Sequence, residues 1–164
     1  MAISKKVMLV GSFGVGKTSL FNRFLFSKFD DKYLTTIGVK VDRKNVTLPD
    51  GRELTLLVWD IAGEVTQDKV PVSYFIGANG IIYVFDLTRP STTRFLNSDL
   101  AFLQKQVPNV VIKVVGNKKD LVNDEQIAKF QTETAIKFDL LTSAKTGEGV
   151  EDLFQLIAQG MVPS

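Results

Sequence analysis

Apolar runs alternate along the chain with stretches in which apolar residues recur every three or four positions. The runs predict strands near residues 4–10, 38–47, 53–59, 80–86, 110–116 and 139–142. The helical spacing predicts helices near residues 17–26, 92–106, 124–136 and 149–161, with a shorter helix within 67–74. The last helix has the clearest apolar stripe, formed by Val150, Leu153, Phe154, Ile157, Ala158 and Met161. We expect this stripe to pack on the core.

The second and third predicted strands are joined without a helix between them. Residues 48–52 read Leu-Pro-Asp-Gly-Arg, a strong turn signal, so these two strands should form an antiparallel hairpin. The other strands are separated by helical segments, which requires parallel pairing with right-handed crossovers. The sequence therefore predicts an α/β fold of three layers, with a six-stranded, mostly parallel sheet and about five helices, in a single domain over residues 1–164.

The composition limits the chemistry that the chain can perform. With 164 residues, 45% of them apolar, and no apolar run near the length of a bilayer span, the chain is typical of a soluble globular domain. It contains no cysteine and no histidine, which excludes disulfides, thiolate chemistry and the commonest general base. Catalysis would have to use carboxylates, lysine, hydroxyl groups, backbone amides or a hard cation.

Charge and the chain ends limit the expected partners and compartment. The net charge is +2, from 20 basic and 18 acidic residues without a long basic run, so nothing supports nucleic-acid binding. The segment before the first strand is too short for a signal peptide, and Ala2 excludes myristoylation, so we expect a cytoplasmic protein. No cysteine is present for lipidation, and we expect a monomer without a membrane anchor in this chain.

Residues 11–18 have the sequence Gly-Ser-Phe-Gly-Val-Gly-Lys-Thr, which fits the phosphate-binding pattern G-x-x-x-x-G-K-[ST]. This segment, the phosphate loop, lies between a predicted buried strand and a predicted helix, as the pattern requires. Its first and last glycines allow backbone N–H groups to point at a polyphosphate, and phosphate binding requires no side chain of Ser12, Phe13 or Val15. Lys17 would place a positive charge at the β and γ phosphates, and Thr18 would offer a hydroxyl to Mg²⁺. The residues expected to contact the nucleotide here are Gly11, Ser12, Phe13, Gly14, Val15, Gly16, Lys17, Thr18 and Ser19.

Further motifs follow the carboxyl ends of strands, where ligands bind in sheets of this kind. Residues 60–63 read D-x-x-G, which would place the Asp60 carboxylate near the metal and the flexible Gly63 near the γ-phosphate. The motif is weak alone and gains weight because it follows both a strand and a phosphate loop. A threonine in the polar segment 33–38 would complete the Mg²⁺ shell only while a γ-phosphate is present.

Residues 117–120, Asn-Lys-Lys-Asp, follow the fifth predicted strand. The Asp120 carboxylate can accept from the N1–H and amino group of guanine, a donor pair that adenine does not offer. Asn117 would tie neighbouring loops together and touch the base, while the stem of Lys118 lies along the ring. Residues 143–145 follow the sixth strand, with Ser143 and Ala144 small enough to let a backbone N–H reach the guanine carbonyl and Lys145 covering the ring edge.

In order, spacing and content, these motifs resemble the Ras superfamily of small GTPases, most closely its Rab-like branch, over essentially the whole chain. The resemblance implies a GTP-binding switch whose cofactor is Mg²⁺ with GTP or GDP. It implies that Thr18 and Thr36 coordinate Mg²⁺, that Asp60 holds it through water, and that Phe29 packs edge-on against the guanine. Without the resemblance, the residues alone favour the alternative that Phe29 is a core residue at the end of a helix.

The resemblance also implies two moving segments, at about residues 29–38 and 61–75, that respond to the γ-phosphate. An apolar surface around Trp59 and Tyr74, with Val65, Val70 and Val72, would then be read by effector or regulator proteins in one state only. The alternative is that Trp59 is simply half-buried in the sheet.

Two residues depart from the family pattern where the attacking water must be held. The family places glutamine where this chain has Glu64, and a carboxylate can accept hydrogen bonds but cannot donate them to the transition state. A small residue is usual where this chain has Phe13, whose ring would crowd the same water. With Lys17, Thr36, Gly63 and Glu64 as the catalytic set, we expect tight nucleotide binding, slow hydrolysis and a weak response to an activating protein.

Smaller departures are Val41, where phenylalanine is often found in Rab-like proteins, and Pro71, which should shorten the helix in the second moving segment. The alternative function is a nucleotide-locked binding scaffold with little or no turnover. An ATPase or kinase is disfavoured, because Asp120 has the wrong hydrogen-bonding sense for adenine. The chain ends soon after its last predicted helix, where Rab-like proteins normally continue into a lipidated tail, so either a tail is missing or the protein never had one.

Overall fold

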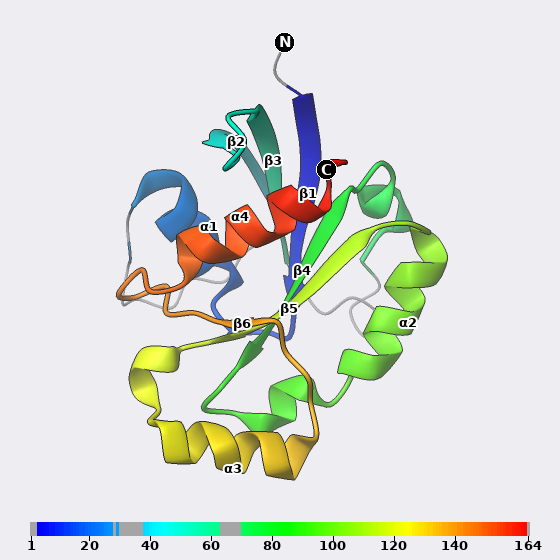
Figure 1. The fold of residues 1–164 in the computed structure, drawn as a ribbon. Helices are drawn as coiled ribbons and strands as arrows, with labels where there is room; N and C mark the ends of the chain where they lie inside the picture. The colour runs from blue at the N-terminus through cyan, green and yellow to red at the C-terminus, as the bar shows by residue number, and fades with distance from the viewer. Residues whose placement is uncertain (1–2, 28, 30–37, 63–69, 164) are drawn as a thin grey trace.

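The computed structural model describes residues 3–27, 29, 38–62 and 70–163 (Figure 1). The strands of the described chain are β1 (Ile3–Gly11), β2 (Val39–Thr47), β3 (Glu53–Ile61), β4 (Gly80–Asp86), β5 (Val111–Asn117) and β6 (Leu140–Leu141). Its α-helices are α1 (Lys17–Phe26), α2 (Leu96–Gln106), α3 (Asp124–Thr134) and α4 (Val150–Gly160). Short 3₁₀ turns are η1 (Val72–Phe75), η2 (Pro90–Thr93) and η3 (Lys119–Leu121).

All six strands form one sheet in the order β2-β3-β1-β4-β5-β6. β2 pairs with β3 in an antiparallel ladder, and the other pairs are parallel, as the turn signal and the intervening helices predicted. The hairpin turn closes through a 2.8 Å bond from the backbone N of Leu48 to the carbonyl of Arg52, with Gly51 at φ 90°. The five parallel strands therefore end together at one edge of the sheet.

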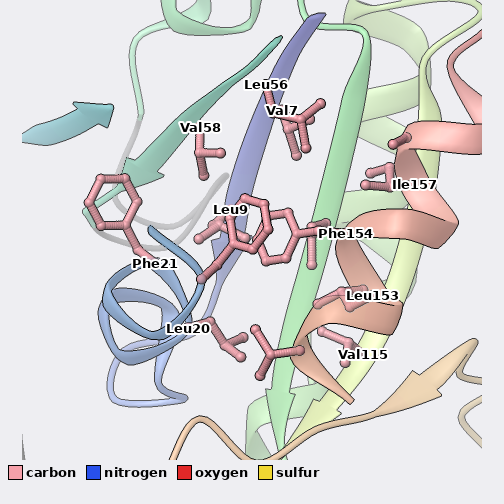
Figure 2. Close-up of a cluster of buried hydrophobic side chains, with 14 of the residues drawn as sticks. Val7, Leu9, Leu20, Phe21, Leu56, Val58, Val115, Leu153, Phe154 and Ile157 are labelled. Atoms are coloured by element: carbon pink, nitrogen blue, oxygen red, sulfur yellow. The ribbon is translucent and has the colours of Figure 1, made fainter. Parts of the chain in front are cut away.

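The central strand β1 is buried on both faces, and its side chains alternate between two cores. Val7 and Leu9 join a cluster with residues of α1 and α4 (Figure 2), whereas Met8 and Val10 join a cluster with residues of α2 and α3. The predicted stripe of α4 lies in the first cluster, where the Phe154 ring stacks on that of Phe24 with centroids 3.7 Å apart. Helices thus cover both faces of the sheet, which confirms the predicted three layers.

Two predicted helices differ in extent from those in the structure. The helix expected from residue 92 begins at Leu96, because residues 90–93 form a 3₁₀ turn in which hydroxyl groups bond to nearby backbone. There, Thr92 Oγ1 accepts from the Asp86 backbone N and donates to the Arg89 carbonyl. In the short helix expected within 67–74, residues 67–69 lie outside the described chain, and the remainder holds only the turn η1 after Pro71. Among the described residues, no helix has the length and apolar character needed to cross a membrane.

Candidate functional site

The phosphate loop connects β1 to α1 at the carboxyl edge of the sheet, and two of its glycines are required by contact as well as by conformation. Gly11 has φ 144°, and a Cβ there would lie 2.2 Å from the Val84 carbonyl oxygen. Gly16 has φ 100°, and a Cβ there would lie 2.3 Å from Asn117 Nδ2. Any larger residue would push the loop away from the ends of β4 and β5, so the glycines fix its position.

The side chains of the phosphate loop lie in different surroundings. Val15 is fully buried in the core, and Ser12 donates a 3.2 Å hydrogen bond to the Thr92 carbonyl, so both anchor the loop. The Phe13 side chain is 55% exposed. Lys17 is nearly buried, and its Nζ donates to the carbonyl of Gly11 at 2.5 Å and of Ser12 at 3.5 Å. The ammonium group is therefore held across the loop, on the carbonyl groups that lead into it.

Thr18, at the start of α1, and Asp60, near the end of β3, are brought together as the motifs predicted. Thr18 Oγ1 donates to Asp60 Oδ2 at 2.6 Å, and Asp60 is fully buried. A hydroxyl and a carboxylate are the hard oxygen groups that Mg²⁺ prefers, so the residues present fit this ion. Among the described residues, no group of three or more His, Cys, Asp or Glu side chains is placed to hold a metal ion. Thr36, Gly63 and Glu64 lie outside the described residues.

Asn117 links the phosphate loop to the loops that follow β5 and β6. Its Nδ2 donates to the Val15 carbonyl at 3.0 Å, while its Oδ1 accepts from Thr142 Oγ1 at 3.1 Å and from the Ala144 backbone N at 3.3 Å. Only 2% of its surface is exposed. The link between loops that the sequence predicted for this residue is present in these hydrogen bonds.

The segment 117–120, the base loop, lies beside the 143–145 loop. Ser143 Oγ donates to Asp120 Oδ1 at 2.8 Å and accepts from the Thr146 backbone N at 3.1 Å. Asp120 is itself exposed, and Lys145 is also exposed, whereas Ser143 and Ala144 are buried. The geometry thus presents one oriented carboxylate and one cation at the surface, above a buried floor of small residues.

Three residues that contact the loops of the site were not predicted from the sequence. Arg23 of α1 donates from Nε to the Ala144 carbonyl at 2.7 Å and from Nη2 to the Lys145 carbonyl, and so holds the 143–145 loop. Asp86 and Arg89 lie beside the phosphate loop and form an ion pair. Asp86 had a usable signal, because it is a carboxylate that ends a buried strand at the same edge as Asp60.

Phe29 is half-buried and packs against the core cluster that contains α1 and α4. This contact is the one expected for a core residue at the end of a helix. Its edge-on contact with a guanine stays a prediction.

The surface around Trp59 and Tyr74 is partly apolar. The two rings lie 6.2 Å apart between centroids, and the half-buried Trp59 is covered on one side by Lys6, whose Nζ is 3.8 Å from the ring centroid. The Lys6 ammonium also donates to the carbonyls of Tyr74 at 2.5 Å and Ile76 at 3.0 Å, and burial lowers the pKa of Lys6. Exposed apolar neighbours are Val41, Val72 and Ile76.

One of the valines expected on this surface is buried in the core instead. Val70 is 7% exposed and packs in the core cluster that contains α2 and α3, which corrects its expected place on the surface. Burial of this short apolar side chain removes it from water and stabilises the packing of the chain at residue 70. Val65 lies outside the described residues.

Comparison with known proteins gives the same relatives as the motifs. The model of the Ras family matches residues 6–162. The GTP-binding protein ypt5 of Schizosaccharomyces pombe is 34% identical over 165 residues, covering 97% of this chain and 78% of the relative. The Ras-related protein Rab-4A of Rattus norvegicus is 36% identical over 162 residues, covering 94% of this chain and 72% of the relative. Rab-4A of Homo sapiens is 37% identical over 157 residues, covering 91% and 70%.

Proposed function

Because this chain belongs to the Ras family, as a Rab-like small GTPase, we propose that it is a molecular switch that binds GTP and GDP with Mg²⁺ and hydrolyses GTP slowly. The observation that carries the proposal is the position of Asn117. Its one amide group bonds to the phosphate loop and to the 143–145 loop, so groups suited to phosphates and to guanine are held in one site.

Base selection rests on Asp120. Its carboxylate is oriented by Ser143 and offers two acceptor oxygens, which match the N1–H and amino donors of guanine. Adenine presents a ring acceptor where guanine has N1–H, so the same carboxylate would repel it. The nucleotide that this site takes is therefore a guanine nucleotide.

In this proposal the phosphate loop and Lys17 bind the phosphates of the nucleotide, and oxygen groups bind Mg²⁺. Thr18, Thr36 and Asp60 would hold Mg²⁺, which neutralises charge on the β and γ phosphates when it is bound. Lys17 would place a further positive charge at the β and γ phosphates. Gly63 would offer its backbone N–H to the γ-phosphate. These groups orient the phosphates and stabilise the charge that develops on them.

Slow hydrolysis is proposed from two side chains. Glu64 in place of glutamine removes a donor from the water-positioning residue, which typically lowers the rate by about 10²–10³. The exposed Phe13 ring stands on the loop that faces the γ-phosphate in the family, where it would crowd the attacking water. For the same reason an activating protein that inserts an arginine should have little effect.

Partner recognition is proposed for the surface around Trp59 and Tyr74, with Val72 beside them. Residues at about 29–38 and 61–75 would change arrangement with the γ-phosphate, and an effector would read this surface in one state. Val41 replaces the larger side chain that is usual in Rab-like proteins, so the partners should differ from those of the relatives.

Nucleotide analysis of the purified protein tests the proposal. We expect bound GDP and GTP, release of phosphate in a single-turnover assay, and no displacement of labelled GTP by excess ATP. Absence of any guanine nucleotide, with no uptake of GDP at micromolar concentration in the presence of magnesium, would refute it. Persistent GTP without phosphate release would favour the second candidate, a nucleotide-locked binding scaffold, for which the exposed Phe13 is the supporting observation.

A further inference from the structure

Asp86, the last residue of β4, is a buried carboxylate that accepts four hydrogen bonds. Its Oδ2 accepts from Lys118 Nζ at 2.8 Å and from Arg89 Nε at 2.9 Å. Its Oδ1 accepts from the backbone N of Thr88 at 2.8 Å and from the Thr88 hydroxyl at 2.6 Å. The side chain has no exposed surface, so these four donors take the place of water around it.

Arg89 extends from this carboxylate to the phosphate loop. While Nε is paired with Asp86, Nη2 donates to the Phe13 carbonyl at 3.0 Å. A Cβ at Gly14 would lie 3.1 Å from the same Nη2, so the guanidinium lies close against the backbone of the loop. One planar group therefore holds a strand end and a loop in a fixed relation.

Lys118 connects the same carboxylate to the base loop. Its backbone has φ 70°, a left-handed conformation that is uncommon for lysine, and its ammonium group is fixed on Asp86. The adjoining backbone is tied as well, since Leu87 N donates to the Asn117 carbonyl at 3.1 Å. The chain Phe13–Arg89–Asp86–Lys118 is thus a second link between the two loops, separate from the amide of Asn117.

The charges in this link favour its persistence. Burial raises the pKa of Asp86, but the hydrogen bonds from Lys118, Thr88 and Arg89 outweigh burial and leave the pKa below its usual value. The carboxylate is therefore ionised at neutral pH between two cations. Charge-assisted hydrogen bonds around a buried group are stronger than those between neutral groups in water.

We propose that Arg89 is a positioning residue that, through Asp86 and Lys118, clamps the phosphate loop to the base loop and so slows the release of bound guanine nucleotide. The proposal rests on the proposed function, because it concerns the same nucleotide site. Arg89 need not touch the ligand. It opposes the separation of the two loops, which must move apart before a nucleotide enclosed by both can leave.

The clamp is tested with the whole chain, magnesium and a fluorescent GDP, whose association and dissociation are followed separately by stopped flow. We expect Arg89→Gln to release GDP about tenfold faster, because two charge-assisted hydrogen bonds are lost, with little change in the association rate. The matched control is Arg94→Gln, which removes an exposed arginine five residues further on whose guanidinium lies over the Phe95 ring. This control should leave both rates unchanged.

Two further variants separate the clamp from a general loss of structure. Asp86→Asn should also speed release, and the double variant with Arg89→Gln should be no faster than Asp86→Asn alone, since both break the same link. Arg89→Lys keeps the charge without the planar fork and should give an intermediate release rate. It also keeps the test decisive if Arg89→Gln yields no folded protein.

The outcomes distinguish the two proposals. If the unaltered protein takes up no GDP, the proposed function and the clamp both fall. If it binds GDP and the Arg89 variants release it within about twofold of the Arg94→Gln control, the clamp alone is overturned. Fully additive effects of Arg89→Gln and Asp86→Asn would also overturn it.

Discussion

Tyr83 of β4 donates a hydrogen bond of 2.6 Å to Asp99 of α2, and both residues are buried. The bond joins the sheet to a helix on one face, and Tyr83 belongs to the core cluster that contains residues of α2 and α3. A buried carboxylate depends on such donors, because water is excluded from around it.

Tyr83→Phe should therefore lower the free energy of unfolding by about 1–3 kcal/mol, since the ring still packs while a donor to Asp99 is lost. Chemical denaturation monitored by circular dichroism measures the change. Tyr74→Phe is the control, because the Tyr74 side chain is partly exposed and water can replace the hydrogen bonds of its hydroxyl. If both substitutions lowered the free energy of unfolding equally, the stabilising role of the Tyr83–Asp99 hydrogen bond would be contradicted.

Gly16→Ala should weaken GDP binding by more than about tenfold, because the new Cβ is strained in the left-handed conformation and would strike Asn117. Equilibrium titration with fluorescent GDP measures the loss. Gly51→Ala is the control, because it places an alanine at φ 90° where an added Cβ has nothing within 4 Å. The prediction fails if the two variants bind GDP equally well.

Asp120→Asn should reverse the base preference. An amide offers one acceptor and one donor, which matches the N1–H and C2 carbonyl of xanthine and mismatches the two donors of guanine. We expect affinity for GTP to fall by at least about a hundredfold while xanthosine triphosphate binds better. Competition between the two triphosphates measures the change, and unaltered selectivity would argue against Asp120 as the base-selecting residue.

Glu64→Gln should raise the single-turnover rate of GTP hydrolysis by about a hundredfold, the lower end of the range for one such donor, because Phe13 would still crowd the attacking water. Phosphate release from preloaded protein measures the rate. Glu53→Gln removes the same charge from an exposed position in β3 and serves as the control. An unchanged rate in Glu64→Gln would count against the account of slow hydrolysis.

The pKa of Asp86 is below its usual value, so its ionised form stabilises the folded state. This stability is fully present above the ordinary aspartate pKa of about 4 and is lost as pH falls toward the lower pKa of the folded state. At pH 7, Asp86→Asn should cost about 1–3 kcal/mol, because it weakens the hydrogen bonds to a buried group, while the two partly exposed cations can be solvated. The difference in the free energy of unfolding between Asp86→Asn and the unaltered protein should become smaller as the pH is lowered from 7 to 3. A constant difference would contradict the prediction.

Local patterns predicted the sheet and the position of the main loops. The apolar run of β1 and the turn at Gly51 are properties of neighbouring residues, so their prediction needed no knowledge of distant contacts. The start of α2 was placed too early, because hydroxyl groups in η2 bond to backbone and compete with the helix.

Contacts between residues that are distant in the sequence could not be predicted. Arg89 meets Phe13 across 76 residues, and Arg23 meets Ala144 across 121, and no local pattern connects such pairs. Asp86 differs, because it ends a strand at the edge where a site was expected. Strand-terminal carboxylates outside known motifs therefore merit the same attention as those within them.

β2 is one of the two outer strands of the sheet, and one row of its backbone groups has no neighbouring strand in the described chain. Such an edge invites a strand of another molecule to add itself. Three exposed residues of β2 are charged: Lys40, Asp42 and Arg43. A strand that paired with β2 would have to desolvate these charged side chains. We therefore expect the charges of this strand to oppose edge-to-edge aggregation.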